Sequence, residues 1–166
     1  MELDDAIRLR RSYRSYSSKN ISEEDLNKIL DAGNKAPVAL GNYLNTKILV
    51  LENEKLDILR NKLISILGKD PTYNSNKLIL IYSKNTNNDL ACLDAGCISE
   101  NIMLKARDLS IDSVMIYSIK SLFNNNELLK EYSNLSNEYK FIVSIALGYR
   151  SNDVVRDVTH KIEVVK

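Results

Sequence analysis

The spacing of apolar residues along the chain predicts helices that alternate with short strands. Apolar side chains recur at helical spacing in residues 3–10, 22–33, 55–67 and 89–109, and a shorter helix is predicted at 125–132. Compact apolar runs at 46–51, 77–83, 112–117 and 140–149 predict strands. These elements together predict one α+β domain over residues 1–166, with about four or five strands in a single sheet.

Local signals sharpen several of these elements. Ser22 is a suitable N-cap for the helix that follows it, and Gly33 is placed to end that helix. The strand at 46–51 is expected to be buried on both faces, or nearly so. The last residues, 161–165, alternate between polar and apolar side chains as an edge strand does, so they are expected to pair with another segment.

The helix at 89–109 carries more apolar surface than one small sheet needs. Its stripe is broad, and the small residues Ala91, Ala95, Gly96 and Ser99 allow another helix to approach closely. Two interpretations remain open on this pattern alone: a dimer interface, or the central core helix of a monomer.

Composition narrows the classes of function. Of 166 residues, 44% are hydrophobic and 27% charged, and the net charge of +1 provides no global attraction to nucleic acid or membrane. Cys92 and Cys97 form no CxxC pattern and are expected to be buried thiols, and a single histidine excludes a histidine-rich metal site. Without a signal-like segment or a long apolar run, a cytoplasmic protein is expected.

A basic cluster within five residues is the first candidate for chemistry. Arg10, Arg11 and Arg14, together with Ser12, present enough donors to fill most acceptors of one phosphate dianion. The alternative is a solvated basic helix end, because cations are stabilised near helix C-termini.

Four segments of the chain occur in the order and spacing of a known family. They are RRSYR at 10–14 ahead of the helix at 22–33, APVALGNYLN at 36–45 before a strand, DAGCISENIMLKA at 94–106, and IALGY at 145–149 with Arg156 downstream. In these segments the chain resembles the nitroreductase-like family of FMN-dependent oxidoreductases. The resemblance implies a three-layer α-β-α sandwich with a mixed or antiparallel sheet. It also implies a homodimer that packs its long helices together and holds two FMN molecules at the interface.

The resemblance also implies which residues contact FMN. They are Arg10, Arg11, Ser12, Arg14 and Arg156 at the phosphate and ribityl chain, Pro37, Val38, Ala39, Asn42 and Leu44 in the loop, and Met115, Ile116 and Tyr117 at a strand end. The backbone at Tyr117 and Ser118 would pass the flavin N5. No catalytic side chain and no metal are expected, since the flavin carries the chemistry.

The chain departs from the family pattern around the loop. It lacks the serine after Pro37, has Leu44 and Asn45 in place of Gln-Pro, and has one extra residue, so Gly41 or Asn42 is the equivalent position. Tyr117 stands where many members have Gly or Glu, and it is placed to stack on the flavin or cover it.

The resemblance implies an oxidoreductase that takes hydride from NADH or NADPH and passes it to a small electron acceptor in a ping-pong cycle. A flavin carrier, store or sensor with little reductase activity is the alternative, motivated by the altered residues 38, 44 and 45. Nucleic-acid binding by the arginines is disfavoured, because the net charge is near neutral and the tyrosines are scattered.

Overall fold

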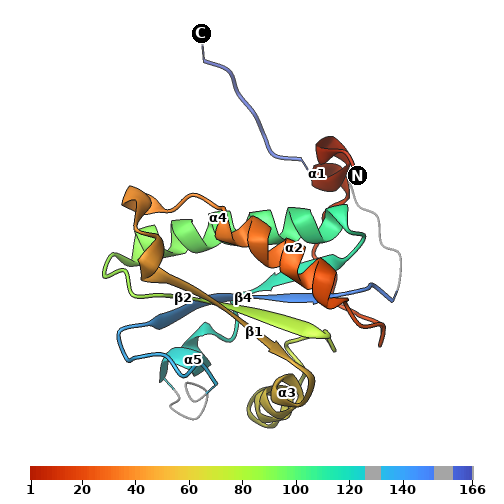
Figure 1. Ribbon diagram of the computed structural model, residues 1–166, viewed down its shortest axis with the longest axis vertical. Helices are drawn as coiled ribbons and strands as arrows, with labels where there is room; N and C mark the ends of the chain where they lie inside the picture. The colour runs from red at the N-terminus through yellow and green to blue at the C-terminus, as the bar shows by residue number, and fades with distance from the viewer. Residues whose placement is uncertain (126–131, 152–158, 166) are drawn as a thin grey trace.

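The computed structural model describes residues 1–125, 132–151 and 159–165 (Figure 1). In chain order the elements are α1 (Leu3–Leu9), α2 (Glu23–Asn34), the 3-10 turns η1 (Ala39–Gly41) and η2 (Tyr43–Asn45), β1 (Thr46–Glu52), α3 (Asn53–Leu67), β2 (Lys77–Ser83), α4 (Asn88–Asp108), β3 (Asp112–Ile116), α5 (Lys120–Asn125) and β4 (Lys140–Gly148). The predicted α+β class is confirmed.

The four described strands form one antiparallel sheet in the order β1-β2-β4-β3. The central strand β2 is buried along its whole length, as its apolar run predicts. The prediction that 46–51 is buried on both faces is wrong: β1 is an edge strand, and within it only Leu51 is buried. The partner register shifts between Ile81 and Tyr82, so β4 has one extra residue there, a β-bulge at Ile142.

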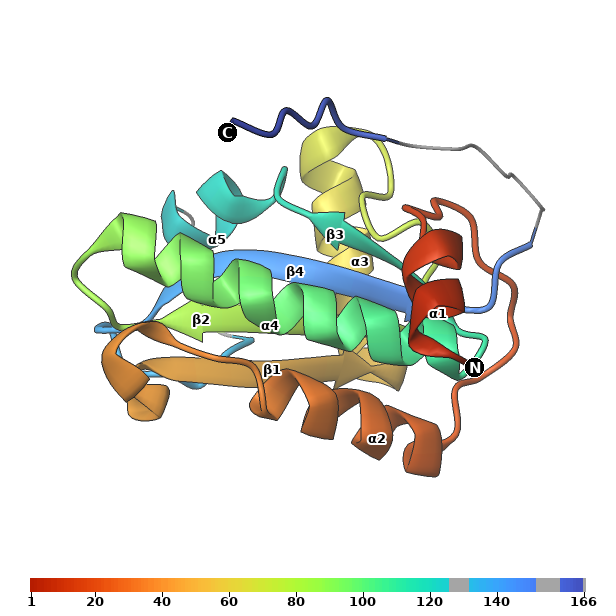
Figure 2. The ribbon, with the colours of Figure 1, turned by 90° about the horizontal axis from the view of Figure 1, so that it is seen from above.

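Helices cover both faces of the sheet (Figures 1 and 2). Ile79 and Ile81 belong to a core cluster with the apolar side chains of α2 and α4, whereas Leu78 and Leu80 pack with those of α3 and α5. Successive side chains of a strand point to opposite faces, so one apolar run serves two cores. The predicted α-β-α sandwich is therefore confirmed.

The sequence assigned roles to two residues at the ends of α2, Ser22 and Gly33. Ser22 caps α2 as predicted, accepting a hydrogen bond from the backbone N–H of Asp25 at 3.1 Å. Gly33 does not end the helix, which continues to Asn34; a Cβ at Gly33 would lie 2.7 Å from the side chain of Ile102. The expectation for Gly33 was wrong because the residue serves a close helix-to-helix approach.

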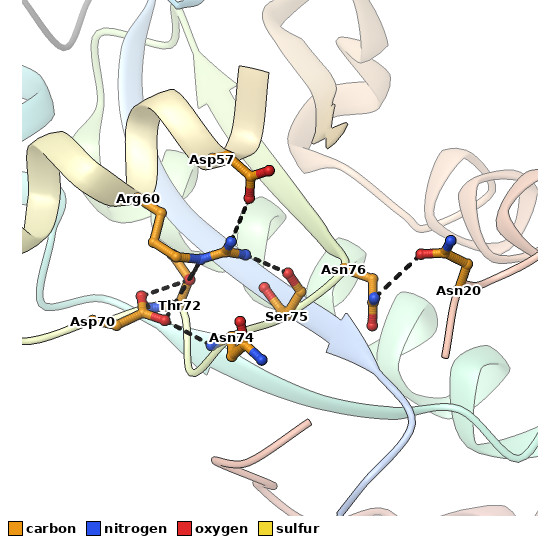
Figure 3. A network of polar contacts seen from close by, with 8 residues as sticks. All are labelled: Asn20, Asp57, Arg60, Asp70, Thr72, Asn74, Ser75 and Asn76. Carbon is orange, nitrogen blue, oxygen red and sulfur yellow. Dashed lines mark hydrogen bonds and ion pairs between the residues drawn. The ribbon is translucent and has the colours of Figure 1, made fainter. Parts of the chain in front are cut away.

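A polar network fixes the loop between α3 and β2 (Figure 3). The guanidinium of Arg60 donates to Thr72 Oγ1 at 3.0 Å and to the Ser75 carbonyl oxygen at 2.6 Å. Asp70 accepts from the backbone N–H groups of Thr72 and Asn74, both at 2.7 Å. The side-chain amides of Asn76 and Asn20 lie within hydrogen-bond distance, 3.3 Å, which joins this loop to the segment leading into α2.

Three other predictions differ from the structure. Within the predicted helix 125–132, residues 126–131 lie outside the described part, Tyr132 is in a turn, and the described helix is Lys120–Asn125. Residues 161–165 form no strand within the protomer, and Ile162, Val164 and Val165 are exposed. The cysteines are not buried: Cys92 is half-buried and Cys97 is exposed.

Candidate functional site

Residues 10–17, here called the arginine segment, are joined to the edge of the sheet by backbone hydrogen bonds. The N–H of Tyr13 donates to the carbonyl of Ser113 in β3 at 3.1 Å, and Ser12 forms a bridge with Ser113. Beyond it, Ser17 N–H donates to the carbonyl of Tyr149 at 2.8 Å. The segment therefore runs from the edge strand β3 to the end of β4.

Two buried tyrosines determine which way the arginine segment faces. Tyr13 and Tyr16 are 8% and 4% exposed and belong to the core beneath the sheet. The hydroxyl of Tyr16 donates to the Tyr13 carbonyl at 2.8 Å, and burial raises the pKa of this phenol. Since these two side chains point inward, Ser12 and Arg14 remain at the surface. The ring of Tyr16 lies over Gly148, where a Cβ would approach it to 2.8 Å.

A buried ion cluster supports the same segment from the side. Asp112 is paired with Arg107 at 2.7 Å, and it accepts a hydrogen bond from the backbone N–H of Arg150 at 3.2 Å. Arg150 in turn donates to the hydroxyl of Tyr13 at 2.8 Å. Burial raises the pKa of Asp112, while the charges of Arg107 and Arg150 act to lower it. The cluster therefore links α4, β3 and the end of β4 to the tyrosine that anchors the arginines.

The arginines themselves retain donors for an anion. Arg10 uses its Nε to pair with Glu100 of α4 at 2.9 Å, and no described residue pairs with its two terminal nitrogens. Arg14 is exposed, and its Nη1 donates over 3.5 Å to the Ser12 carbonyl. Arg11 folds back on the carbonyl of Arg10 at 2.7 Å. Paired terminal nitrogens form a fork that suits phosphate oxygens, so Arg10 and Arg14 fit a phosphate group.

The end of strand β3 lies on the same side of the protomer as the arginine segment. In β3, Met115 is 40% exposed while Ile116 is buried, as the alternation of a strand requires. Tyr117 is 62% exposed directly after the strand, and Ser118 is exposed beside it. The side chain of Ile116 points into the core, so only its backbone is available to a ligand. The ammonium of Lys120 lies 5.2 Å from the centre of the Tyr117 ring.

Residues 36–45, here called the 36–45 loop, lie elsewhere. The backbone N–H of Ala39 donates to the buried carboxylate of Asp94 in α4 at 2.7 Å. Leu40 and Gly41 both have positive φ angles, +56° and +66°. Pro37, Leu40, Asn42 and Leu44 are exposed, and Val38 and Ala39 are half-buried. Tyr43, Leu44 and Val38 line a cavity of about 350 Å³ against β1 and α4.

Within one protomer the two groups of residues do not meet. The 36–45 loop lies by the N-terminal part of α4, whereas α1 and the start of the arginine segment lie toward its other end (Figures 1 and 2). Their contacts on α4, Asp94 and Glu100, are six residues or about one and two-thirds turns apart, and so lie on different sides of the helix. The structure brings together Arg10, Arg11, Ser12 and Arg14 near β3, but not with the loop. Arg156 lies outside the described residues.

Several residues that shape the site were absent from the sequence prediction. Tyr13 was noted only as a member of the basic stretch 10–14, and Tyr16 was not singled out, although the alternation of arginine, serine and tyrosine is the signal of a strand-like segment with one buried side. Asp94 was noticed only as part of a motif, and Asp112 and Arg150 gave no local signal. Their roles depend on contacts between segments 38 or more residues apart.

Comparison with known proteins agrees with this geometry. Residues 7–78 match the sequence profile of the nitroreductase family. A protein of Archaeoglobus fulgidus, provisionally named an NADH dehydrogenase/NAD(P)H nitroreductase, is 27% identical over 149 residues, covering 89% of this chain and 84% of its own. A nitroreductase of Bacteroides fragilis, solved with bound FMN, superposes with a TM-score of 0.88 at 24% identity over 100% of both chains. One from Desulfitobacterium hafniense, also with FMN, gives 0.85 at 21% identity over 100% of both chains.

The resemblance to the nitroreductase family is thereby confirmed, and the fold of the chain is the nitroreductase fold. Among the described residues, no group of three or more His, Cys, Asp or Glu side chains is arranged to hold a metal ion. In the same part of the chain, no helix has the length and apolar character needed to cross a membrane.

Proposed function

We propose that this chain is an FMN-dependent oxidoreductase that moves hydride from NADH or NADPH to a small electron acceptor. The observation that carries the proposal is the arginine segment, held rigidly at the edge of β3 next to an exposed strand end. The FMN-bound nitroreductases that share the fold support it.

The residues present suit the phosphate end of FMN. A phosphate monoester carries close to two negative charges, and a chain of net charge +1 needs a local cluster to hold it. Arg10 and Arg14 would supply paired N–H donors and Ser12 a hydroxyl, on a segment whose direction is set by the buried tyrosines. The ion pair with Glu100 leaves the terminal nitrogens of Arg10 available while orienting its guanidinium.

Other residues would position and shield the ring. When bound, FMN would supply the hydride chemistry at its N5. The backbone at Tyr117 and Ser118 would lie along the ring near N5, and the exposed Tyr117 side chain would exclude water from one side. Within these residues no side chain needs to act as general acid or base.

A second copy of the chain would complete this site. The 36–45 loop, which the resemblance places at the flavin, lies on another side of α4 from the arginines. Leu93 is 66% exposed and Cys97 is exposed on α4, and Leu3 and Ile7 of α1 are 64% and 52% exposed. We propose that a homodimer covers these side chains and brings the loop of one protomer to the arginines of the other.

The direct test is the visible spectrum of the purified protein, recorded before and after NADH or NADPH is added without oxygen. A yellow protein that bleaches with either nicotinamide is the expected result. A yellow protein that bleaches with neither would instead support a flavin carrier or sensor, an alternative favoured by the unusual Leu44 in the loop. A colourless protein that takes up no added FMN would contradict both.

A further inference from the structure

Lys120 lies where the proposed flavin site adjoins a separate cavity. Its ammonium is 5.2 Å from the centre of the Tyr117 ring and 3.9 Å from Cys92 Sγ. The side chain is half-buried, and the ion pairs among the described residues include none formed by Lys120. A charge partly removed from water without a counter-ion is costly, so this position gains from the arrival of an anion.

The cavity beside Lys120 has the polarity that an anion needs. It measures about 320 Å³ and lies between α5, the first residues of α4, the start of β4 and residues 133–139. Lys120 and Lys140 supply its positive charge, and Asn88, Asn125 and Asn137 supply carboxamides. None of its described lining residues is Asp or Glu. Carboxamide N–H groups and ammonium groups both donate to oxyanions.

We propose that this cavity binds an anionic group, a carboxylate or a phosphate, on the molecule that exchanges electrons at the flavin site, with Lys120 as its counter-ion. The inference rests on the proposed function for the identity of that molecule. The anion has two possible sources, a carboxylate on the electron acceptor or the 2′-phosphate that distinguishes NADPH from NADH. In either case Lys120 favours the co-substrate that carries the additional anionic group over the analogue that lacks it.

The test is calorimetric titration without any reductant, so that binding and not turnover is measured. The probes are 4-nitrobenzoate and its neutral amide, and NADP⁺ beside NAD⁺. Lys120→Gln should weaken binding of 4-nitrobenzoate, or of NADP⁺, by about fivefold or more. Binding of the matching probe without the additional anionic group, the neutral amide or NAD⁺, should be unchanged. Lys120→Arg should keep the preference. Lys62→Gln is the matched control, because Lys62 is also half-buried over a tyrosine ring, 5.2 Å from that of Tyr132, and neither of these two residues lines the cavity.

The results separate the possible outcomes. Loss for 4-nitrobenzoate alone assigns the cavity to the acceptor, and loss for NADP⁺ alone assigns it to the hydride donor. Unchanged preferences in Lys120→Gln, or an equal loss in Lys62→Gln, would overturn the proposal. The titrations use the protein as purified, and the described lining residues all come from one protomer. A protein that binds no FMN but keeps the preference that depends on Lys120 would contradict the proposed function and not this proposal.

Discussion

The arginine segment and the 36–45 loop are both surface segments, yet the protomer holds them in different ways. The arginine segment is joined to two strands and anchored by Tyr13 and Tyr16, which are both buried. The 36–45 loop is mostly exposed, and it is held by the hydrogen bond from Ala39 to Asp94 and by bonds that Leu44 and Asn45 accept at its end. From this difference we infer that the residues proposed to hold the phosphate are positioned within one chain, whereas the 36–45 loop reaches the flavin only from a second chain.

The largest expected difference between the two regions is in stability. Tyr16→Ala should lower the free energy of unfolding by about 3–5 kcal/mol, because it empties a fully packed site in the core. Tyr43→Ala in the loop removes a side chain that is 56% exposed and should change it by less than about 0.5 kcal/mol. Urea denaturation of both variants measures the contrast. Equal effects would show that the segment is not anchored as described.

The next effect concerns FMN. Arg14→Ala should weaken FMN binding about tenfold or more, since hydrogen bonds to charged groups are strong, and should leave the fold intact because Arg14 is exposed. Fluorescence titration with FMN measures it. Arg8→Ala removes the same charge from α1, where Arg8 pairs with Asp5, and should leave FMN affinity nearly unchanged. A similar loss in both variants would assign the effect to net charge alone.

Release of the loop should destabilise the protein less than Tyr16→Ala does. Asp94→Ala removes the acceptor for Ala39 and should destabilise the protein by about 1–3 kcal/mol. Amide hydrogen exchange should accelerate within residues 38–42 and stay unchanged in the arginine segment. Asp89→Ala, in the exposed first turn of α4, is the control. Faster exchange in both regions would mean that they are not held independently.

The proposed partner contact can be probed without altering stability. Cys97 is exposed near the middle of α4, so antiparallel packing of two α4 helices across a two-fold axis would bring it near its own copy. A short bis-maleimide should therefore yield a covalent dimer on a denaturing gel, and Cys97→Ser should abolish it. If the covalent dimer persists in Cys97→Ser, the contact lies elsewhere.

The sequence predicted where helices and strands lie along the chain better than it predicted which of them pack side by side. The strand at 77–83 was predicted at its observed bounds, because an apolar run between turn residues carries its own signal. The edge position of β1 and the packing role of Gly33 were not predicted, since both depend on which element lies beside them. For the site, spacing marked the arginines as a candidate and left a solvated helix end open; their assignment to FMN came from the resemblance and stays a prediction. The 36–45 loop lies on a side of α4 that depends on how the chain folds. The residues of the loop motif alone do not indicate this side.

The central claim is that one flavin site takes its arginines and its 36–45 loop from different chains. Asp94→Ala releases the loop proposed to contact the flavin ring, so it should weaken FMN binding as Arg14→Ala does. Mixing the two variants by joint unfolding and refolding tests the claim, at an FMN concentration where neither variant alone retains the cofactor. Random pairing makes half of the dimers mixed, and each mixed dimer would regain one intact site, so about a quarter of all sites should bind FMN. If retention stays at the level of the separate variants, both halves of the site belong to the same chain and the account is contradicted.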